Sequence, residues 1–340
     1  MRFSQRQIAL SGTRVWLLSM MLAVIASPAG SAALEWKPEK NVDIIVGTGP
    51  GGGQDKSART LQRILQEKRL IAVAATVVNK PGGGGAVGWT YLNQHAGDAH
   101  YLEVGNPTLL TNQIVGRSAL SYADVTPIAM LFSESVAFSV REESPIKSGR
   151  DLIERLRKDA GSVSVSVGSS LGSTNHIAIA AVAKASGGDP RRLKAVVFQG
   201  GGEAITALLG GHVDLIASAA NNVVGHVAAG KLRVIAVAAP QRLGGSLAVV
   251  PTWREQGVDT VVTNWRMVAG AKSMTQPQLA YWEGVFARLV DTDEWKKDLE
   301  QNVFENTFMT SQKTSDYLKS QYHSFKAALA EVGMAKDGKQ

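Results

Sequence analysis

Residues 42–65 read VDIIVGTGPGGGQDKSARTLQRIL, and this stretch decides the fold. It starts with a short, mostly apolar run rich in β-branched residues, which is typical of a buried strand. A glycine loop, residues 47–53, follows the run. Apolar residues such as Leu61 and Ile64 then recur at helical spacing after Asp55. The pattern predicts a strand, a glycine loop and a helix, which together form one βα unit.

The same unit recurs along the chain, and this repetition predicts an α/β fold with parallel strands. Val73–Val78 is expected to be a strand, Pro81–Gly85 a loop, and Val87 the opening of a helix. Further strands are expected at Tyr101–Val104, Ile128–Phe132, Val136–Val140, Val163–Val167, Ala195–Phe198, Val213–Ala217 and Val234–Ala238. Further helices are expected at Ser148–Lys158, Asn175–Ala185, Glu203–Leu209, Pro277–Leu289, Thr292–Gln301 and Gln312–Val332.

The chain length of 340 residues exceeds the roughly 100–200 residues of a typical domain, so two lobes are expected. The second lobe is predicted to begin near Val136, where the strands change their partner sheet. After Pro240 the sequence is loop-rich, and the last helices are expected to pack back on the first lobe. We therefore expect lobe 1 to comprise residues 34–134 and 242–340, and lobe 2 residues 135–241, joined by an ordered hinge.

The N-terminus has the features of a secretory signal peptide. Three arginines precede an apolar run, Val15–Ala26, that is too short to span a bilayer, which takes roughly 20 residues. Small residues follow and offer cleavage after Ala32 or Ala33. We expect residues 1–33 to be removed and the mature chain to reach a bacterial periplasm; an uncleaved N-terminal anchor is the alternative. Loss of the three arginines lowers the formal net charge from +7 to +4, so nucleic acid is not an expected partner.

The composition excludes several kinds of chemistry. The sequence contains no cysteine, which excludes disulfides, thiolate nucleophiles and iron–sulfur clusters. The six histidines are scattered, so we expect no metal site, and no cofactor is expected either. Most tryptophans are expected in the core, although Trp265, which precedes Arg266, could line a cleft. Glycine is the outlier, with 35 residues, about 10% against the usual ~7%, gathered in a few loops.

Four of these glycine loops are each expected between a strand and a helix. They are Pro50–Asp55, Pro81–Gly85, Gly168–Thr174 and Gly200–Glu203. At the carboxyl end of a parallel sheet, such loops point unpaired backbone N–H groups toward one crevice, with the positive ends of the helix dipoles behind them. The pattern predicts an anion-binding site; ordinary turns and helix caps are the alternative interpretation.

Two nucleotide-binding motifs are incomplete in this sequence. Gly47, Gly49 and Gly52 satisfy G-x-G-x-x-G, but the second strand ends in Asn79 where a ribose-binding acid belongs. A phosphate P-loop also fails, because Asp55 stands where that motif requires a glycine before its lysine. The sequence therefore gives little support to a nucleotide site.

A serine hydrolase is the alternative from a different functional class. Residues 168–172 satisfy G-x-S-x-G in a strand–turn–helix context, so Ser170 could be a nucleophile. Asp214 and His226 follow in the chain order of such a triad. The polar cluster that begins at Ser173 serves equally well as a helix N-cap and as a ligand donor, which favours binding over catalysis.

The sequence also resembles a known family over nearly the whole mature chain. The stretches that carry the resemblance, in order, are WKPEK from Trp36, PGGGQDKSAR from Pro50, NKPGGGGAVG from Asn79, DVTPIA from Asp124, SPIKSGRDLI from Ser144, GSTNHIA from Gly172, GGGEAITALLGGHVD from Gly200, GKLRVIAV from Gly230 and VPTWREQGVD from Val250. Together they resemble the periplasmic receptors of tripartite tricarboxylate transporters, a group of bacterial extracytoplasmic solute-binding proteins.

The resemblance implies a two-lobed periplasmic binding protein fold of type II-like form, in which each lobe is a mostly parallel sheet flanked by helices. It implies a cleft that closes on an organic carboxylate held by the amides of the glycine loops, without catalysis. The ligand-binding residues expected on this basis are Gly51, Gly52, Gly53, Asp55, Gly83, Gly84, Gly85, Ala86, Thr108, Ser169, Ser173, Thr174, Asn175, Gly201, Gly202, Ser218 and Asn221.

One departure from the family pattern bears on the ligand. Many relatives carry an acidic residue shortly after the Gly-x-Val-Asp strand, where amino acids can be recognised, whereas this chain has Ser218 followed by Asn221 and Asn222. A tricarboxylate such as citrate, or a dicarboxylate, is therefore expected rather than a free amino acid. The resemblance also implies a monomer that delivers its ligand to the small and large membrane subunits of a permease.

Overall fold

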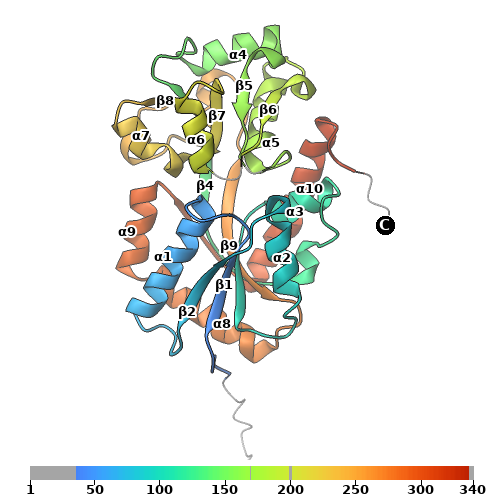
Figure 1. The fold of residues 1–340 in the computed structure, drawn as a ribbon, viewed down its shortest axis with the longest axis vertical. Helices are drawn as coiled ribbons and strands as arrows, with labels where there is room; N and C mark the ends of the chain where they lie inside the picture. The colour runs from blue at the N-terminus through green and yellow to red at the C-terminus, as the bar shows by residue number, and fades with distance from the viewer. Residues whose placement is uncertain (1–35, 169, 199–200, 337–340) are drawn as a thin grey trace, which may run out of the picture. The chain divides into compact units, whose positions relative to one another are not determined.

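The computed structural model describes residues 36–168, 170–198 and 201–336. The expected signal peptide, residues 1–33, lies outside the described residues. Two sheets share one long strand, β4 (Val125–Arg141), which runs through both (Figure 1). The residues of β4 up to Ser135 pair with β9 in sheet A, and those from Val136 onward pair with β7 and β8 in sheet B. We call the residues packed on sheet A the A half and those packed on sheet B the B half.

Sheet A is mixed. Its strands β1 and β2 are parallel, as are β1 and β3, whereas β9 runs antiparallel to both β3 and β4, and β10 antiparallel to β4. Its members besides β4 are β1 (Val42–Val46), β2 (Ala75–Asn79), β3 (Tyr101–Gly105), β9 (Thr263–Ala271) and β10 (Glu305–Thr310). The parallel strands are those of the predicted βα units, so their carboxyl ends meet at one edge.

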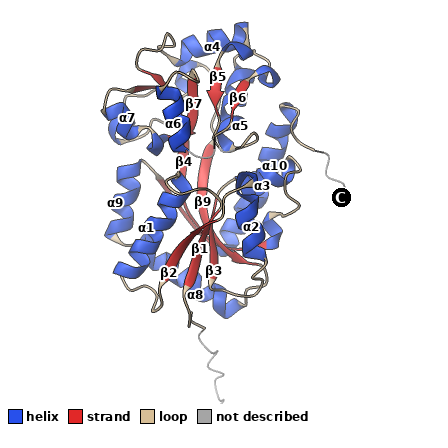
Figure 2. Cartoon of the chain, viewed as in Figure 1, coloured by secondary structure: helices blue, strands red, loops and turns tan. Residues whose placement is uncertain are grey.

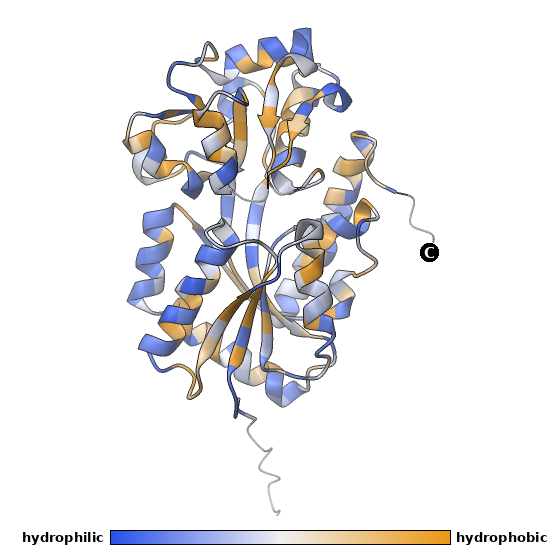
Figure 3. Ribbon diagram, viewed as in Figure 1, coloured by the Kyte–Doolittle hydropathy of each residue, from blue (hydrophilic) through white to orange (hydrophobic). Residues whose placement is uncertain are grey.

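Helices cover both faces of sheet A, because alternate strand residues point to opposite faces. Ile44 and Val46 pack in one core, while Ile45 packs in the other. The helices on the first face are α1 (Gly53–Glu67), α8 (Gln276–Val290) and α9 (Asp293–Asn302). Those on the second face are α2 (Ala86–Asn93), α3 (Thr108–Ile114) and α10 (Ser311–Glu331). Figure 3 shows the apolar strands between helices that alternate apolar and polar residues.

Sheet B repeats this arrangement on a smaller scale, as Figure 2 shows. Strand β5 is parallel to β6 and β7, and β4 is antiparallel to β7 and β8. Its strands besides β4 are β5 (Ser164–Ser166), β6 (Lys194–Val196), β7 (Leu215–Ala219) and β8 (Leu232–Val237). Its helices are α4 (Gly149–Lys158), α5 (Thr174–Ala185), α6 (Gly201–Leu209) and α7 (Val224–Ala228).

The α/β fold predicted from the sequence is confirmed, and the last three helices lie within two residues of their predicted bounds. The prediction of a loop-rich segment as far as Pro277 is wrong, because β9 forms there and pairs with strands more than a hundred residues earlier. Leu247 and Trp253 pack in the cores of sheet B, not of sheet A. We therefore propose that the return to the A half falls at the start of β9, not at residue 242 as expected.

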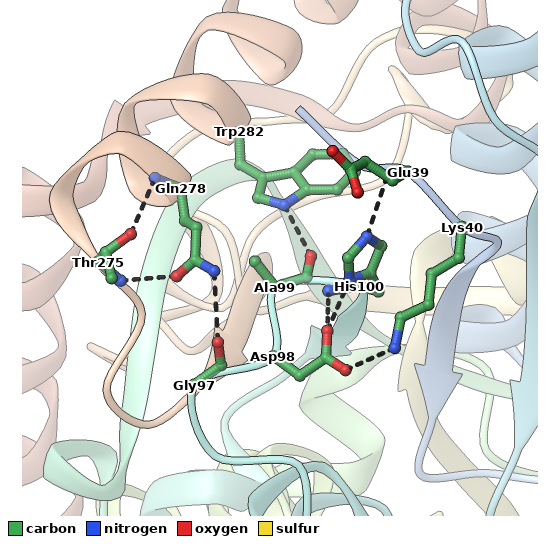
Figure 4. A network of polar contacts seen from close by, with 9 residues as sticks. All are labelled: Glu39, Lys40, Gly97, Asp98, Ala99, His100, Thr275, Gln278 and Trp282. Carbon is green, nitrogen blue, oxygen red and sulfur yellow. Dashed lines mark hydrogen bonds and ion pairs between the residues drawn. The ribbon is translucent and has the colours of Figure 1, made fainter. Parts of the chain in front are cut away.

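A polar network fixes the start of the described chain to the segment before β3 (Figure 4). The Asp98 carboxylate accepts a 2.9 Å hydrogen bond from Lys40 Nζ and lies 2.6 Å from His100 Nδ1. The Glu39 N–H donates to His100 Nε2, so the two ring nitrogens of His100 connect Glu39 to Asp98. Burial raises the pKa of Asp98, but the hydrogen bonds from Lys40 and His100 outweigh it and hold the pKa at about 2.

Candidate functional site

A cavity of about 100 Å³ lies between the A half and the B half, and Asn264 and Arg266 of β9 form part of its wall. The A half contributes the ends of β1 and β3 with the loops that follow them, and the B half contributes β7 and the starts of α5 and α6. The residues that line the cavity are Thr48, Gly52, Gly53, Gln54, Asn106, Thr108, Gly168, Ser173, Thr174, Asn175, Gly201, Ala204, Ile216, Ala217, Ser218, Ala219, Asn222, Asn264 and Arg266.

Three helices begin at this cavity. Helices α1, α5 and α6 start at Gly53, Thr174 and Gly201, and all three residues line it. The N-cap of α1 is Gly52, which supplies no side-chain hydrogen bond, whereas Ser173 caps α5 by accepting from the His176 N–H. Helix N-termini present orphan N–H groups and a positive partial charge, so the cavity is suited to an anion.

Asp55 holds the first glycine loop in shape. Its carboxylate accepts hydrogen bonds from the Gly51 N–H (2.9 Å), Arg59 Nε (3.0 Å) and Asn79 Nδ2 (2.9 Å). Burial raises the pKa of Asp55, but these three hydrogen bonds outweigh it and leave the pKa below its ordinary value. Asp55 is therefore ionised and turned toward the loop, where it fixes the backbone that leads into α1.

A chain of side-chain hydrogen bonds fixes the polar wall of the A half. Thr108 donates to Asn106 Oδ1 through its N–H at 2.9 Å and its hydroxyl at 2.6 Å. Asn106 Nδ2 in turn donates to Gln54 Oε1 at 3.2 Å, and Gln54 Nε2 donates to the Val104 carbonyl. Because each amide is held by a neighbour, this wall is ordered before any ligand arrives.

Arg266 is the one charged residue among the described residues that line the cavity. It lies on β9, is 4% exposed, and its Nη2 is 2.5 Å from Glu134 Oε1 on β4. Asn264 Nδ2 donates to the same Glu134 oxygen at 2.7 Å. Burial raises the pKa of Glu134, and Arg266 and Asn264 oppose this shift without cancelling it. The site thus contains a buried ion pair on the two strands that connect the halves.

The second glycine loop lines a separate, neighbouring cavity. That cavity has a volume of about 370 Å³ and includes Gly83, Gly84, Gly85, Arg117 and Ser170. The Gly85 N–H donates to Gly82 O within the loop at 2.9 Å. The Gly85 N–H, which was expected to be free for a ligand, is therefore already hydrogen-bonded within the loop.

The structure brings some of the predicted ligand-binding residues together and separates others. Those that line the cavity between the halves are Gly52, Gly53, Thr108, Ser173, Thr174, Asn175, Gly201 and Ser218. Gly83, Gly84 and Gly85 line the neighbouring cavity, and Ala86 lines a third one on the surface. Ser169 lies outside the described residues.

Four further predicted residues do not line the cavity between the halves. Asp55 faces the glycine loop, and the N–H of Gly51 is used by the Asp55 carboxylate. Gly202 is the second residue of α6, and it is exposed. Asn221 precedes Asn222, which is the residue that reaches the cavity.

The prediction missed several lining residues for two reasons. Thr48 and Gln54 lie within the first glycine loop and Asn106 follows the strand expected at Tyr101–Val104, but the prediction took mainly the glycines of the first loop as donors and passed over these side chains. Asn264 and Arg266 lie on β9, which was expected to be loop. No local alternation marks them, because β9 is buried continuously from Trp265 onward. Trp265, which was considered as a residue that lines a cleft, is fully buried in a core and does not line the cavity.

The geometry does not support the hydrolase triad. Ser170 Oγ is buried and has no hydrogen-bond partner in the described structure. The Asp214 carboxylate accepts from Ser164, at 2.8 Å from its N–H and 2.6 Å from its hydroxyl, and not from His226. A serine nucleophile requires a base within hydrogen-bond reach and a group that orients this base, and these residues do not form that arrangement.

Within the described ranges, no group of three or more acidic or histidine side chains is arranged to hold a metal ion. In the same part of the chain, no helix is both long and apolar enough to cross a membrane. The polar groups that line the cavity are backbone groups, amide and hydroxyl side chains, and the guanidinium of Arg266.

A polar cavity between two α/β halves whose sheets share one long strand is the architecture of a solute-binding protein. The family model described as "Tripartite tricarboxylate transporter family receptor" matches residues 58–334. Because this match covers most of the chain, the protein belongs to that receptor family.

Individual relatives agree with this assignment. Protein BugT of Bordetella pertussis is 26% identical over 275 residues, 77% of this chain and 81% of BugT. MatC of Rhodopseudomonas palustris, solved with bound malate, matches with a TM-score of 0.77 at 21% identity over 86% of this chain and 99% of MatC. Another R. palustris protein, solved with adipate, matches with a TM-score of 0.79 at 23% identity over 88% of this chain and 99% of its own. The two structures show the same fold.

Proposed function

We propose that this protein is a periplasmic receptor that captures a small organic carboxylate and delivers it to a tripartite tricarboxylate transporter permease. One observation carries the proposal: the N-terminal ends of α1, α5 and α6, from both halves, line a single cavity. An anion placed there accepts hydrogen bonds from both halves at once, which a neutral solute does less well.

The ligand class is a di- or tricarboxylate. MatC is described with malate and a second structural relative with adipate, so both relatives hold carboxylic acids. Ser218, at the position where the family resemblance implies an acid in many relatives, and the nearby Asn222 offer polar but uncharged groups to the cavity. A ligand with a free ammonium group finds no carboxylate among the described lining residues, which favours an acid such as succinate, malate, adipate or citrate.

Hinge closure is the proposed mechanism of capture. Strand β4 and the segment that leads into β9 connect the halves, and Asn264 and Arg266 of β9 line the cavity, so bending at these two connections would open and close it. The ligand shifts the population toward the closed form by its greater affinity for that form. Charge-assisted hydrogen bonds to helix N-termini contribute roughly 1.5–3 kcal/mol each, so a few of them exceed the cost of association.

We extend the proposal to the export of the protein and to its membrane partners. Residues 1–33 act as a cleaved signal peptide, and the mature protein acts as a monomer in the periplasm. The closed form docks on the small and large membrane subunits of the permease. Family membership and the leader-like N-terminal sequence support these assignments.

Calorimetric titration of the purified protein with succinate, malate, adipate and citrate tests the proposal. We expect at least one acid to bind and to raise the melting temperature, since a ligand at about 100 times its Kd adds about 2.7 kcal/mol of stability. Glucose and glutamine serve as neutral and zwitterionic controls. Binding of either control with no response to any acid would show that the site is not a carboxylate site.

A further inference from the structure

We propose that Arg266 determines the specificity of this receptor for anions, by supplying a fixed cationic anchor for one ligand carboxylate. Glu134 and Asn264 are the positioning residues that hold its guanidinium in place. The inference rests on the proposed function, and it names the side chain that would select a negatively charged ligand.

The position of Arg266 places its charge next to a helix N-terminus. A Cβ added at Gly53, the first residue of α1, would lie 3.5 Å from Arg266 Nη2. A carboxylate that accepts from the first N–H groups of α1 would therefore lie beside the guanidinium. Two sources of positive potential, the helix end and the arginine, meet at one point of the cavity.

The guanidinium has donors to spare. Nη1 donates to the Trp265 carbonyl at 3.1 Å, and Nη2 pairs with Glu134. Nε is buried and has no hydrogen-bond partner in the described structure. An arginine carries five N–H donors, so the contacts to protein leave capacity for a ligand carboxylate.

Glu134 and Asn264 fix the direction of the guanidinium. Glu134 on β4 and Asn264 on β9 are opposite each other in the register of the two strands, and Asn264 Nδ2 donates to Glu134 Oε1 at 2.7 Å. The same oxygen lies 2.5 Å from Arg266 Nη2. Glu134 is 3% exposed, so water does not compete with its carboxylate for the Arg266 guanidinium. An anchor held in this way loses little freedom when a ligand binds.

A purely structural ion pair does not explain this placement. Buried ion pairs are seldom more stabilising than apolar residues of the same size, because both charges lose their hydration. Here Arg266 lines the cavity, whereas Glu134 is behind it and is absent from the lining residues. The positive member of the pair thus faces the ligand, and the negative member is shielded from it.

Four variants separate the anchor from a structural pair: Arg266→Gln, Arg266→Lys, Glu134→Gln and, as a surface control with the same charge change, Arg63→Gln. Arg63 lies on α1, 47% exposed, and pairs only with Glu67 among the described ion pairs. The probes are the tightest-binding acid among succinate, malate, adipate and citrate, and the neutral diamide or triamide of that acid. Circular dichroism checks that each variant is folded before titration calorimetry.

We expect Arg266→Gln to weaken binding of the acid by about 10- to 100-fold, the loss typical of a charged hydrogen-bond partner. Arg266→Lys restores part of that loss, and Arg63→Gln has no effect. Glu134→Gln keeps an acceptor for Arg266 but removes the opposing negative charge, so it binds the acid at least as tightly as the wild type. The amide binds weakly to all four variants.

Three outcomes overturn the inference. A folded Arg266→Gln variant with wild-type affinity shows that Arg266 is not the anchor, while the proposed function stands. Equal losses in Glu134→Gln and Arg266→Gln show that the pair is only structural. If the wild type binds none of the acids, the proposed function fails and the inference with it. Should Arg266→Gln not fold, Arg266→Lys still decides, because it is expected to bind the acid more weakly than the wild type, and an unchanged affinity in a folded Arg266→Lys variant contradicts the anchor.

Discussion

Arg117 Nη2 donates a 3.3 Å hydrogen bond to the carbonyl oxygen of Leu171 and so connects the two halves of the protein. Arg117 lies on the loop after α3, and its Nη1 is held at 2.8 Å by Asn112 Oδ1. Leu171 precedes α5 in the B half. This contact lies at the rim of the neighbouring cavity, where it joins the second glycine loop region to the segment that leads into α5.

Replacing Arg117 with glutamine should weaken ligand binding by about 2- to 10-fold, because a hydrogen bond between the halves is worth roughly 0.5–1.5 kcal/mol. Arg117 is exposed, so the melting temperature of the free protein should change little. Calorimetry on the variant, with exposed Arg191→Gln as control, measures the effect. Identical affinity would mean that this hydrogen bond does not favour the ligand-bound form.

Gly52→Val is expected to reduce carboxylate binding at least about tenfold while leaving the fold intact. Gly52 has an extended backbone, with φ −72°, and a Cβ there would meet nothing closer than 3.7 Å, so the side chain fits but obstructs the N-terminus of α1. Titration and thermal melting of the variant measure both effects. A stable variant with normal affinity would contradict binding at that helix end.

Gly84→Val, by contrast, should unfold or destabilise the protein. Gly84 has φ +66°, and a Cβ there would lie 3.1 Å from Ser170 Oγ and 3.2 Å from Asn112 Oδ1. A β-branched residue is disfavoured at such a positive φ. We expect the melting temperature to fall by several degrees, which a fluorescence melt would detect; an unchanged melt would show that the loop can adopt another conformation.

Asp55→Asn should destabilise the protein by about 1–3 kcal/mol, because the carboxylate accepts hydrogen bonds from three groups, one of them charged. An amide replaces one acceptor oxygen with a donor, and this donor would face the Gly51 N–H, the Arg59 guanidinium or the Asn79 amide. Urea unfolding quantifies the loss, with Asp259→Asn, whose side chain is 84% exposed, as the surface control. Equal effects of the two substitutions would show that Asp55 has no special role in the loop.

The Asp98 network predicts a stability difference that depends on pH. The pKa of Asp98 is about 2 in the folded protein, below the ordinary value near 3.8, so the ionised carboxylate favours folding. This contribution, about 1 kcal/mol after screening by solvent, is present in full above about pH 4 and is lost as the pH falls through 2.

The measurement is the free energy of unfolding of the wild type and of Asp98→Asn between pH 2 and 6. The difference between the two should be constant above about pH 4 and should shrink toward pH 2. A difference that persists unchanged at pH 2 would place the stabilising effect outside the ionisation of Asp98.

Local patterns predicted much of the fold. Strand β1 was predicted with its observed bounds, and α5 and α6 begin within two residues of the predicted starts, because apolar period and glycine position are local signals. Strand β9 could not be found in this way, since its partners Leu102 and Val125 are remote in sequence. Pairing across such distances depends on the packing of the whole A half.

The parts of the candidate site formed by backbone N–H groups could be predicted from the sequence, whereas the parts formed by side chains on distant strands could not. Gly53 and Thr174 line the cavity because each begins a helix at the end of a strand, which the strand–loop–helix pattern predicts. Arg266 and Glu134 form an ion pair although they are 132 positions apart in the sequence. The pair exists only after β4 and β9 have assembled. No local pattern reports such a pair.

The length of β4 has a consequence for how the protein folds. Its 17 residues are one continuous strand, and Ser135 and Val136, neighbours in the chain, belong to different sheets. In each sheet β4 lies between two neighbouring strands, so neither half can lose its sheet without removing an interior strand of the other. We expect the halves to melt in a single cooperative transition, and expect that neither half, expressed separately, would be a stable domain.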